Sequence, residues 1–286
     1  MKIGIIGTGL LGSSVAVRLA QSENEVFAYN RTIEKVKVLE KYGIKVSKSV
    51  NDLFNTCDYI ISVLADYQAN QESFSKIESF SDNSAKVFIQ ISTLSPDENK
   101  ELEKMFKDKN INYLESPVLG SKKEAESGKL IIMVGGDKAI YEKCEKLFKL
   151  LSENYRYIGE IGKASSLKLA LNGLIASLTA SFSLSLGIIQ KSQVDVEIFM
   201  DILRNSALYA PTFDKKLENM LNRNFDNPNF PVKHLLKDVN LIKETAEKLN
   251  LDTSVVNGVK NIIEKALTMN LSEKDYSAIF NAIVTD

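Results

Sequence analysis

The amino terminus carries the feature that most restricts the fold, a glycine-rich turn between a short apolar strand and a helix. Lys2 to Ile6 predicts the strand and Leu10 to Gln21 has helical spacing. The turn between them is Gly7-Thr8-Gly9-Leu10-Leu11-Gly12, which matches G-x-G-x-x-G. Gly7 permits a tight turn, Gly9 lets a pyrophosphate approach the backbone, and Gly12 allows close packing of helix on strand. The motif predicts that a dinucleotide binds at the start of this helix.

Strands and helices alternate through the first half of the chain. Further strands are expected at Glu25–Tyr29, Tyr59–Leu64, Lys86–Ile91, Ile111–Glu115 and Leu130–Val134, with helices at Thr32–Tyr42 and Asp137–Leu151. Repeated βαβ units imply a parallel sheet with helices on both faces. We therefore predict an α/β Rossmann domain over residues 1–161, with a doubly wound and mostly parallel sheet.

Strand signals fade after Gly162, so an all-helical domain is expected over residues 162–286. It would begin with a stretch from Leu169 to Gln190 that has no charged residue and is long enough to span a membrane. The hydroxyls in this stretch weaken that interpretation, and a long helix buried between two domains is preferred. Ser177 to Leu186 alternates polar and apolar residues, which locally favours a strand.

Composition excludes several classes of function. Lys plus Arg number 36 against 37 for Asp plus Glu, so the chain lacks the basic excess expected of a nucleic-acid-binding protein. It has two cysteines and one histidine, which argues against a disulfide framework, a His-rich metal site and a His-based triad. We expect a cytoplasmic protein that binds no metal, nucleic acid or membrane.

The end of the second strand indicates which dinucleotide binds. A carboxylate there would bind the ribose hydroxyls of NAD, but this chain has Asn30-Arg31-Thr32. The Arg31 guanidinium can pair with a 2′-phosphate, and the polar neighbours can add hydrogen bonds. The cofactor predicted from these residues is NADP(H).

Four further segments resemble the β-hydroxyacid dehydrogenase family. They are Ile91-Ser92-Thr93-Leu94-Ser95-Pro96; Glu115-Ser116-Pro117-Val118-Leu119-Gly120-Ser121 with Ala125, Gly128 and Leu130; Gly159-Glu160-Ile161-Gly162-Lys163-Ala164-Ser165-Ser166-Leu167-Lys168 with Asn172; and Phe230-Pro231-Val232-Lys233-His234-Leu235-Leu236-Lys237-Asp238. The segments occur in the family's order and cover essentially the whole chain. Gly120-Ser121-Lys122-Lys123 and Asp275-Tyr276-Ser277-Ala278 are most similar to its glyoxylate and succinic semialdehyde reductases.

The resemblance implies roles for single residues. Lys168 would be the general acid in reduction, and Asn172, one turn later on the same helix face, would hold the lysine or the substrate. Cofactor contacts are implied for Leu64, Ala65, Thr93 and Lys237. Substrate contacts are implied for Ser92, Thr93, Leu119, Gly120, Ser121, Lys168, Phe230 and Asp238.

These residues together predict an NADPH-dependent reductase of small aldehydes or keto acids that carry a carboxylate. An NAD(P)-dependent 3-hydroxyacid dehydrogenase is the alternative within enzymes, and a non-catalytic dinucleotide-binding module is the alternative of another class. Leu119 stands where the family usually has serine, so the exact substrate stays open. The family resemblance also implies a homodimer or homotetramer.

Overall fold

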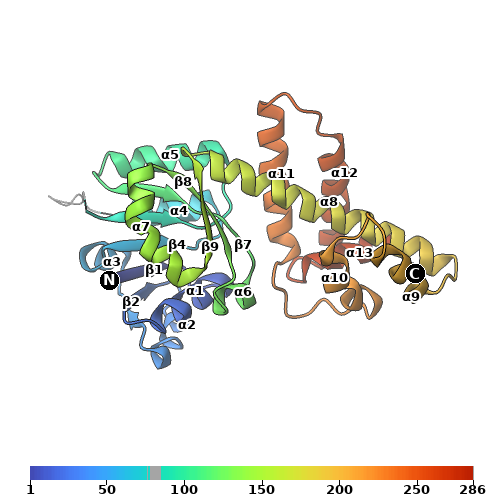
Figure 1. Cartoon of the computed structure of the whole chain (residues 1–286), viewed down its shortest axis with the longest axis horizontal. Helices are drawn as coiled ribbons and strands as arrows, with labels where there is room; N and C mark the ends of the chain where they lie inside the picture. Colours follow the sequence, from blue (N-terminus) through green and yellow to red (C-terminus); the bar gives the residue numbers. More distant parts are fainter. Residues whose placement is uncertain (76, 78–84, 286) are drawn as a thin grey trace. The chain divides into compact units, whose positions relative to one another are not determined.

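A computed structural model describes residues 1–75, 77 and 85–285 of the chain. The chain divides into two compact units, Met1–Leu169 and Ala170–Asp286 (Figure 1). The division falls within the long helix α8 (Lys163–Lys191), whose first turns therefore belong to the amino-terminal unit.

The amino-terminal unit is built on one sheet with strand order β3-β2-β1-β4-β5-β6-β8-β7, and β9 pairs with β8. Strands β1 to β6 run parallel to one another, β8 is antiparallel to β6 and β7, and β9 is parallel to β8. This arrangement confirms the predicted mostly parallel α/β sheet. The strands are β1 (Lys2–Ile6), β2 (Glu25–Tyr29), β3 (Lys45–Val46), β4 (Tyr59–Ser62), β5 (Val87–Gln90), β6 (Asn112–Glu115), β7 (Val118–Leu119), β8 (Ile131–Gly136) and β9 (Asn154–Gly159).

Helices cover both faces of this sheet (Figure 1). Neighbouring side chains of a strand point to opposite faces, so Phe88 and Ile89 of β5 belong to different apolar clusters. The cluster around Ile89 includes side chains of α1 and α7, and the cluster around Phe88 includes side chains of α3 and α5. The helices of this unit are α1 (Leu10–Ala20), α2 (Glu34–Lys37), η1 (Glu40–Tyr42), α3 (Val50–Thr56), α4 (Tyr67–Phe74), α5 (Pro96–Lys107), α6 (Lys122–Glu126) and α7 (Lys138–Leu151).

The carboxyl-terminal unit is helical in its described part, as predicted. After α8 it contains α9 (Val196–Arg204), α10 (Pro211–Leu221), α11 (Val232–Lys248), α12 (Ser254–Thr268), η2 (Tyr276–Ala278) and α13 (Ile279–Ile283). One face of α8, with Ala176, Ala180 and Leu186, packs into the core of this unit. The segment Ser177 to Leu186 is thus helical despite its alternating pattern.

Helix α8 is long and apolar enough to span a membrane. Less than half of its most apolar stretch is buried within the structure. Its hydroxyls are satisfied within the helix: Thr179 donates to the carbonyl of Ile175, and Ser183 donates to that of Thr179. The apolar contacts of one face with α10 and α11 account for this helix as a core element of the helical unit.

The helix predicted over Thr32–Tyr42 is wrong as a continuous element. The structure forms the single turn of α2 and then the 3₁₀ turn η1, which ends at Gly43 with φ of 80°. The segment offers few apolar positions to bury, because Val36 and Leu39 are its buried side chains. A short amphipathic stretch with so small a buried face does not extend into a longer helix.

Candidate active site

The glycine-rich turn between β1 and α1 has the geometry that its motif predicts. Gly7 has φ of 92°, and a Cβ on Gly12 would lie 2.0 Å from the carbonyl oxygen of Gly7. A Cβ on Gly9 would meet no atom within 4 Å, so the backbone is open to a ligand at this point. The buried hydroxyl of Thr8 has no hydrogen-bond partner in the described chain. Open backbone beside an orphaned donor at a helix start fits a dinucleotide phosphate.

The residues after β2 differ in their contacts, because Asn30 binds other parts of the protein whereas Arg31 and Thr32 are exposed. The Asn30 side chain accepts from the Thr8 N–H at 3.2 Å and donates to the Thr32 carbonyl at 3.0 Å. Asn30 therefore holds the end of β2 against the glycine-rich turn, whereas sequence reasoning gave it a direct cofactor contact. Arg31 and Thr32 are exposed, which leaves the guanidinium accessible to an anionic ligand.

The segments that follow β4 and β5 meet beside this turn. The Ser92 hydroxyl donates a hydrogen bond to the Leu64 carbonyl, and a Leu64 methyl would lie 3.1 Å from a Cβ on Gly7. Ala65 is exposed next to Leu64, and Thr93 is half-buried next to Ser92. The structure thus brings together four residues predicted to contact cofactor or substrate, and it uses the Ser92 hydroxyl to join the two segments.

The segment implied to contact the substrate follows β7 (Val118–Leu119). Leu119 is half-buried and pairs with Ile131 of β8, and Gly120 is exposed with φ of 111°. The Ser121 N–H donates to the Glu124 carboxylate at 2.8 Å, and the Ser121 hydroxyl donates to it at 3.2 Å. Both hydrogen-bond donors of Ser121, a residue implied to contact the substrate, are therefore engaged by Glu124 in this structure.

Lys168 lies on the part of α8 that belongs to the amino-terminal unit, and only 8% of its surface is exposed. By contrast, Lys163 at the first position of the same helix is exposed to solvent, as is usual for lysine. Burial of an ammonium is costly unless polar groups surround it. The buried position of Lys168 therefore requires polar surroundings, and it distinguishes this lysine from the exposed Lys163 of the same helix.

Glu115, the last residue of β6, was quoted only as part of a motif, yet it is fully buried. Its Oε1 accepts N–H groups from Gly162 at 2.8 Å and from Ala164 at 2.9 Å, at the start of α8. Burial raises the pKa of Glu115, and the Ser165 hydroxyl and the amides at the start of α8 oppose that rise. An acidic residue ending a buried strand is the signal by which the sequence could have shown it.

In the carboxyl-terminal unit, Asn172 and Asp238 form a buried pair. The Asn172 amide donates to the Asp238 carboxylate at 2.6 Å, and the Lys237 ammonium lies 3.0 Å from the other carboxylate oxygen. The buried Asn172 carbonyl oxygen has no hydrogen-bond partner in the described chain. Three residues predicted for the site thus form one network, in which Asp238 orients the Asn172 amide.

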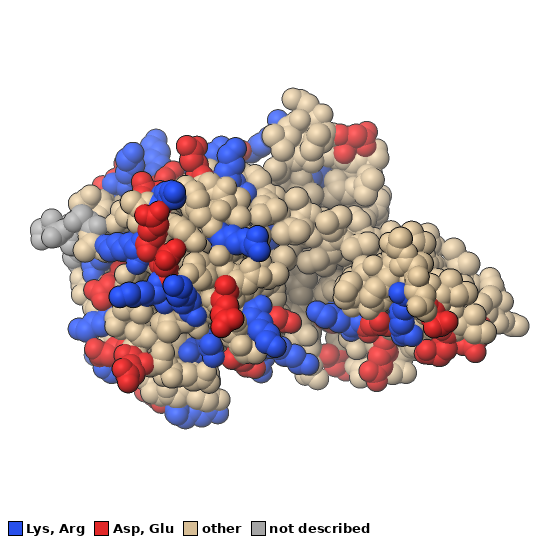
Figure 2. Space-filling view, in the orientation of Figure 1, with Lys and Arg blue, Asp and Glu red and all other residues tan. Residues whose placement is uncertain are grey.

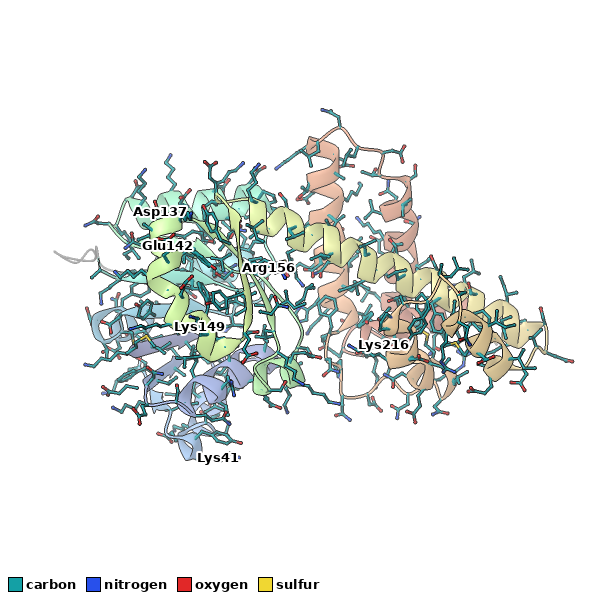
Figure 3. The ribbon with its side chains drawn as sticks, viewed as in Figure 1. Lys41, Asp137, Glu142, Lys149, Arg156 and Lys216 are labelled. Carbon is teal, nitrogen blue, oxygen red and sulfur yellow. The ribbon has the colours of Figure 1, made fainter. Side chains whose placement is uncertain are left out.

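The segment of Phe230 is anchored by a buried ion pair that sequence reasoning missed. Lys216 of α10 donates to both oxygens of Asp275 at 2.8 and 2.9 Å (Lys216 is labelled in Figure 3). The backbone of Asp275 forms an antiparallel β-bridge with that of Pro231, and the Tyr276 N–H donates to the Phe230 carbonyl. The Phe230 ring lies 5.9 Å from that of Tyr276 and 6.4 Å from that of His234.

His234 lies beside this segment in a partly buried position. Burial lowers the pKa of His234, with Lys233 and Lys237 adding to the shift.

No cluster of three or more His, Cys, Asp or Glu residues that could hold a metal ion occurs within residues 1–75, 77 and 85–285. The polar groups described above act through hydrogen bonds and ion pairs. They are the groups available for binding a dinucleotide and for proton transfer.

Two family models match successive parts of the chain. Residues 2–159 match the family model for the NAD-binding domain of 6-phosphogluconate dehydrogenase. Residues 162–283 match the model described as NAD-binding of NADP-dependent 3-hydroxyisobutyrate dehydrogenase.

Two relatives from Arabidopsis thaliana are similar along nearly the whole chain. Glyoxylate/succinic semialdehyde reductase 2, chloroplastic, is 31% identical over 99% of this chain and 79% of its own length. Glyoxylate/succinic semialdehyde reductase 1 is 30% identical over 99% of this chain and 98% of its own length. The crystal structure of 3-hydroxyisobutyrate dehydrogenase from Salmonella typhimurium shares the fold, with a TM-score of 0.86, 18% identity, and 98% and 99% of the two chains covered. The chain belongs to the β-hydroxyacid dehydrogenase family and is a nicotinamide-dinucleotide-dependent oxidoreductase of that type.

Proposed function

We propose that this enzyme uses NADPH to reduce the carbonyl group of a small aldehyde or keto acid, of the glyoxylate or succinic semialdehyde type, to a hydroxy acid. The observation that carries the proposal is the buried Lys168 near the start of α8. The similarity to the two Arabidopsis reductases supports the substrate class. The exposed Arg31 after β2, without a carboxylate at position 30, supports NADPH over NADH.

The amino-terminal unit would hold the cofactor through the Gly7–Gly12 turn, Leu64, Ala65 and Thr93, with Arg31 and Thr32 at the 2′-phosphate. When bound, the reduced cofactor supplies a hydride to the carbonyl carbon. Negative charge then develops on the carbonyl oxygen, and the Lys168 ammonium both stabilises that charge and donates the proton. In the oxidative direction the neutral Lys168 amine accepts the hydroxyl proton.

The Asn172–Asp238–Lys237 network has a separate task in this proposal. Asp238 fixes the Asn172 amide, so the free Asn172 carbonyl oxygen is held in one orientation on α8. A preoriented acceptor can bind an ammonium or a substrate hydroxyl without further ordering. The Gly120–Ser121 segment would hold the substrate carboxylate once Ser121 is released from Glu124.

The test is NADPH and NADH oxidation against glyoxylate, succinic semialdehyde and related carbonyl acids, with NAD(P)-linked oxidation of 3-hydroxyisobutyrate for comparison. Lys168→Ala should lower kcat by about a hundredfold or more, the usual size of a lost general acid. NADPH affinity, measured by fluorescence titration, should be retained. The matched control is Lys163→Ala, an exposed lysine of the same helix, which should keep normal kcat. Near-normal turnover of Lys168→Ala would remove this residue from the mechanism, and faster oxidation of the hydroxy acid with NAD would favour the dehydrogenase alternative.

We also propose that the enzyme is a homo-oligomer that assembles through its helical unit. Helix α8 exposes Leu184 and Ile188, and α9 exposes Ile198 and Ile202, each pair four residues apart and so on one helix face. Broad areas of this unit carry no charge on the face shown in Figure 2. Ile202→Glu should lower the mass measured by analytical ultracentrifugation, whereas Val38→Glu, at an exposed apolar residue of the other unit, should not. An unchanged mass for Ile202→Glu would place the interface elsewhere.

A further inference from the structure

We infer that Glu115 is a positioning residue for Lys168: its carboxyl group fixes the first turn of α8 and thereby the place of the ammonium that donates the proton. The inference rests on the proposed role of Lys168. It concerns only the amino-terminal unit, to which Glu115 and the first turns of α8 both belong.

The first step concerns the start of α8. The first N–H groups of any helix have no partner within the helix. Here the Glu115 carboxylate accepts the N–H of Gly162, which precedes the helix, and that of Ala164 in its first turn. The Ser166 hydroxyl donates to the Gly162 carbonyl at 2.6 Å and is a further contact of this first turn. The partial positive charge of the helix start also favours a carboxylate at this place.

The second step leads from this turn to Lys168. Ala164 and Lys168 are four residues apart on a continuous helix, so their side chains lie on one face in successive turns. A carboxyl group bound at Ala164 therefore sets both the rotation and the axial position of Lys168. A proton donor displaced by about 1 Å can lose a hundredfold in rate. The anchor thus acts on turnover and leaves cofactor binding to other residues.

The third step concerns the room for the carboxyl group. Gly135 of β8 lies opposite Glu115 in the sheet register. A Cβ on Gly135 would lie 2.4 Å from Glu115 Oε1, the oxygen that binds Gly162 and Ala164. Glycine at 135 is therefore required for the carboxyl group to keep its place. Gly135→Ala would displace the anchor without removing it.

The experiment compares kcat and the KM for NADPH in Glu115→Ala, Glu115→Gln and Gly135→Ala. Glu115→Ala leaves the N–H groups of Gly162 and Ala164 unpaired and should lower kcat about tenfold or more, with the KM for NADPH within about twofold. Glu115→Gln keeps an oxygen acceptor of the same length and should recover most of the turnover. Gly135→Ala should lower kcat in the same direction as Glu115→Ala.

Asp137→Ala is the matched control. Asp137 also binds two N–H groups at a helix start, those of Ala139 and Ile140 in α7, which carries no proposed catalytic residue (Figure 3 labels Asp137). It should lower the unfolding temperature without changing kcat. A folded Glu115→Ala enzyme with unchanged kcat, or with equal changes in kcat and the KM for NADPH, overturns the inference. If Glu115→Ala does not fold, Gly135→Ala decides on the same criteria.

A second measurement separates this inference from the proposed function. The NMR signal of ¹³C-methylated Lys168, assigned with Lys168→Ala, should move in Glu115→Ala and stay in place in Glu115→Gln and Asp137→Ala. This readout needs no substrate. A wild-type enzyme inactive on every carbonyl acid would defeat the proposed function alone, and an unmoved Lys168 signal would defeat the role of Glu115 alone.

Discussion

The two units hold buried carboxylates in different ways. In the amino-terminal unit, Glu115 is bound by backbone N–H groups at the start of α8. In the carboxyl-terminal unit, Asp275 is bound by the Lys216 ammonium and by the hydroxyl and N–H of Ser277, and Asp238 is bound by the side chains of Asn172 and Lys237. A sheet unit leaves free amides where its loops and helices begin, whereas helix interiors use their own backbone groups. The buried carboxylates among these helices are therefore bound mainly by side-chain partners.

The largest expected effect comes from breaking such a side-chain pair. Asp275→Ala leaves Lys216 buried without its counter-charge, and breaking a buried pair on one side costs about 3–5 kcal/mol. Urea unfolding should show this loss, together with a raised KM, because Asp275 also anchors the Phe230 segment. The control Asp214→Ala removes a partner of the more exposed Arg204 in the same unit and should have a much smaller effect. Equal losses in the free energy of unfolding for both variants would show that the buried ion pair contributes no more to stability than the exposed one.

Arg31 represents the opposite case, a cation that is exposed at the end of β2. Arg31→Ala should raise the KM for NADPH about tenfold, the loss expected when one charge-assisted contact of ~1.4 kcal/mol is removed. The KM for NADH, which has no 2′-phosphate, should stay within about twofold. Steady-state kinetics with both cofactors provides the measurement. Equal increases for the two would show that Arg31 does not bind the 2′-phosphate.

Position 119 carries leucine, whose side chain has no hydrogen-bond donor, and a serine there tests whether such a donor would contact the substrate. Leu119→Ser adds a hydroxyl next to Gly120 and should lower the KM for glyoxylate or succinic semialdehyde about fivefold, equivalent to ~1 kcal/mol for one hydrogen bond. Turnover should change less than KM. If no short carbonyl acid binds more tightly, position 119 does not face the substrate carboxylate.

The smallest effect is a pH dependence of stability. Burial raises the pKa of Glu115 above its ordinary value of 4.5, so the fold disfavours the ionised form. The wild type should therefore lose stability relative to Glu115→Gln as pH rises from 4.5 through the folded-state pKa, while below 4.5 their difference should stay constant. Urea unfolding of both proteins between pH 4 and 8 measures this difference. A wild type that gains stability relative to Glu115→Gln as pH rises would mean that the amides at the start of α8 outweigh burial.

Local patterns in the sequence accounted for much of the fold. The glycine motif and the apolar runs correctly placed β1, α1, β2 and β5, and amphipathic spacing placed α7. Helix α5 was missed although Ser95 and Glu98 form a reciprocal cap at its start, a signal visible in the sequence. Strand β9 was missed because Asn154–Gly159 contains one apolar aliphatic residue, and its pairing with β8 is a tertiary contact.

The candidate site was less accessible to such patterns. Its residue types could be named in advance, but Asn30, Ser92 and Ser121 turned out to bind neighbouring protein groups. Glu115 and Asp275 find their partners far along the chain, in Gly162 and Lys216. No local spacing encodes such contacts, because they arise only when the strands and helices have packed.

The anchor at Glu115 also has a consequence for the order of folding. Its carboxyl group is placed by the pairing of β6 with β8, through Gly135, and it then binds the amides that begin α8. Bringing Glu115 together with Gly135 and Gly162 closes long loops of chain, and the entropy lost must be offset by the contacts of the sheet. We therefore expect the Glu115 anchor to hold the first turn of α8 only after β8 has paired with β6. During synthesis, the part of the helix that carries Lys168 would then be fixed later than this strand pair.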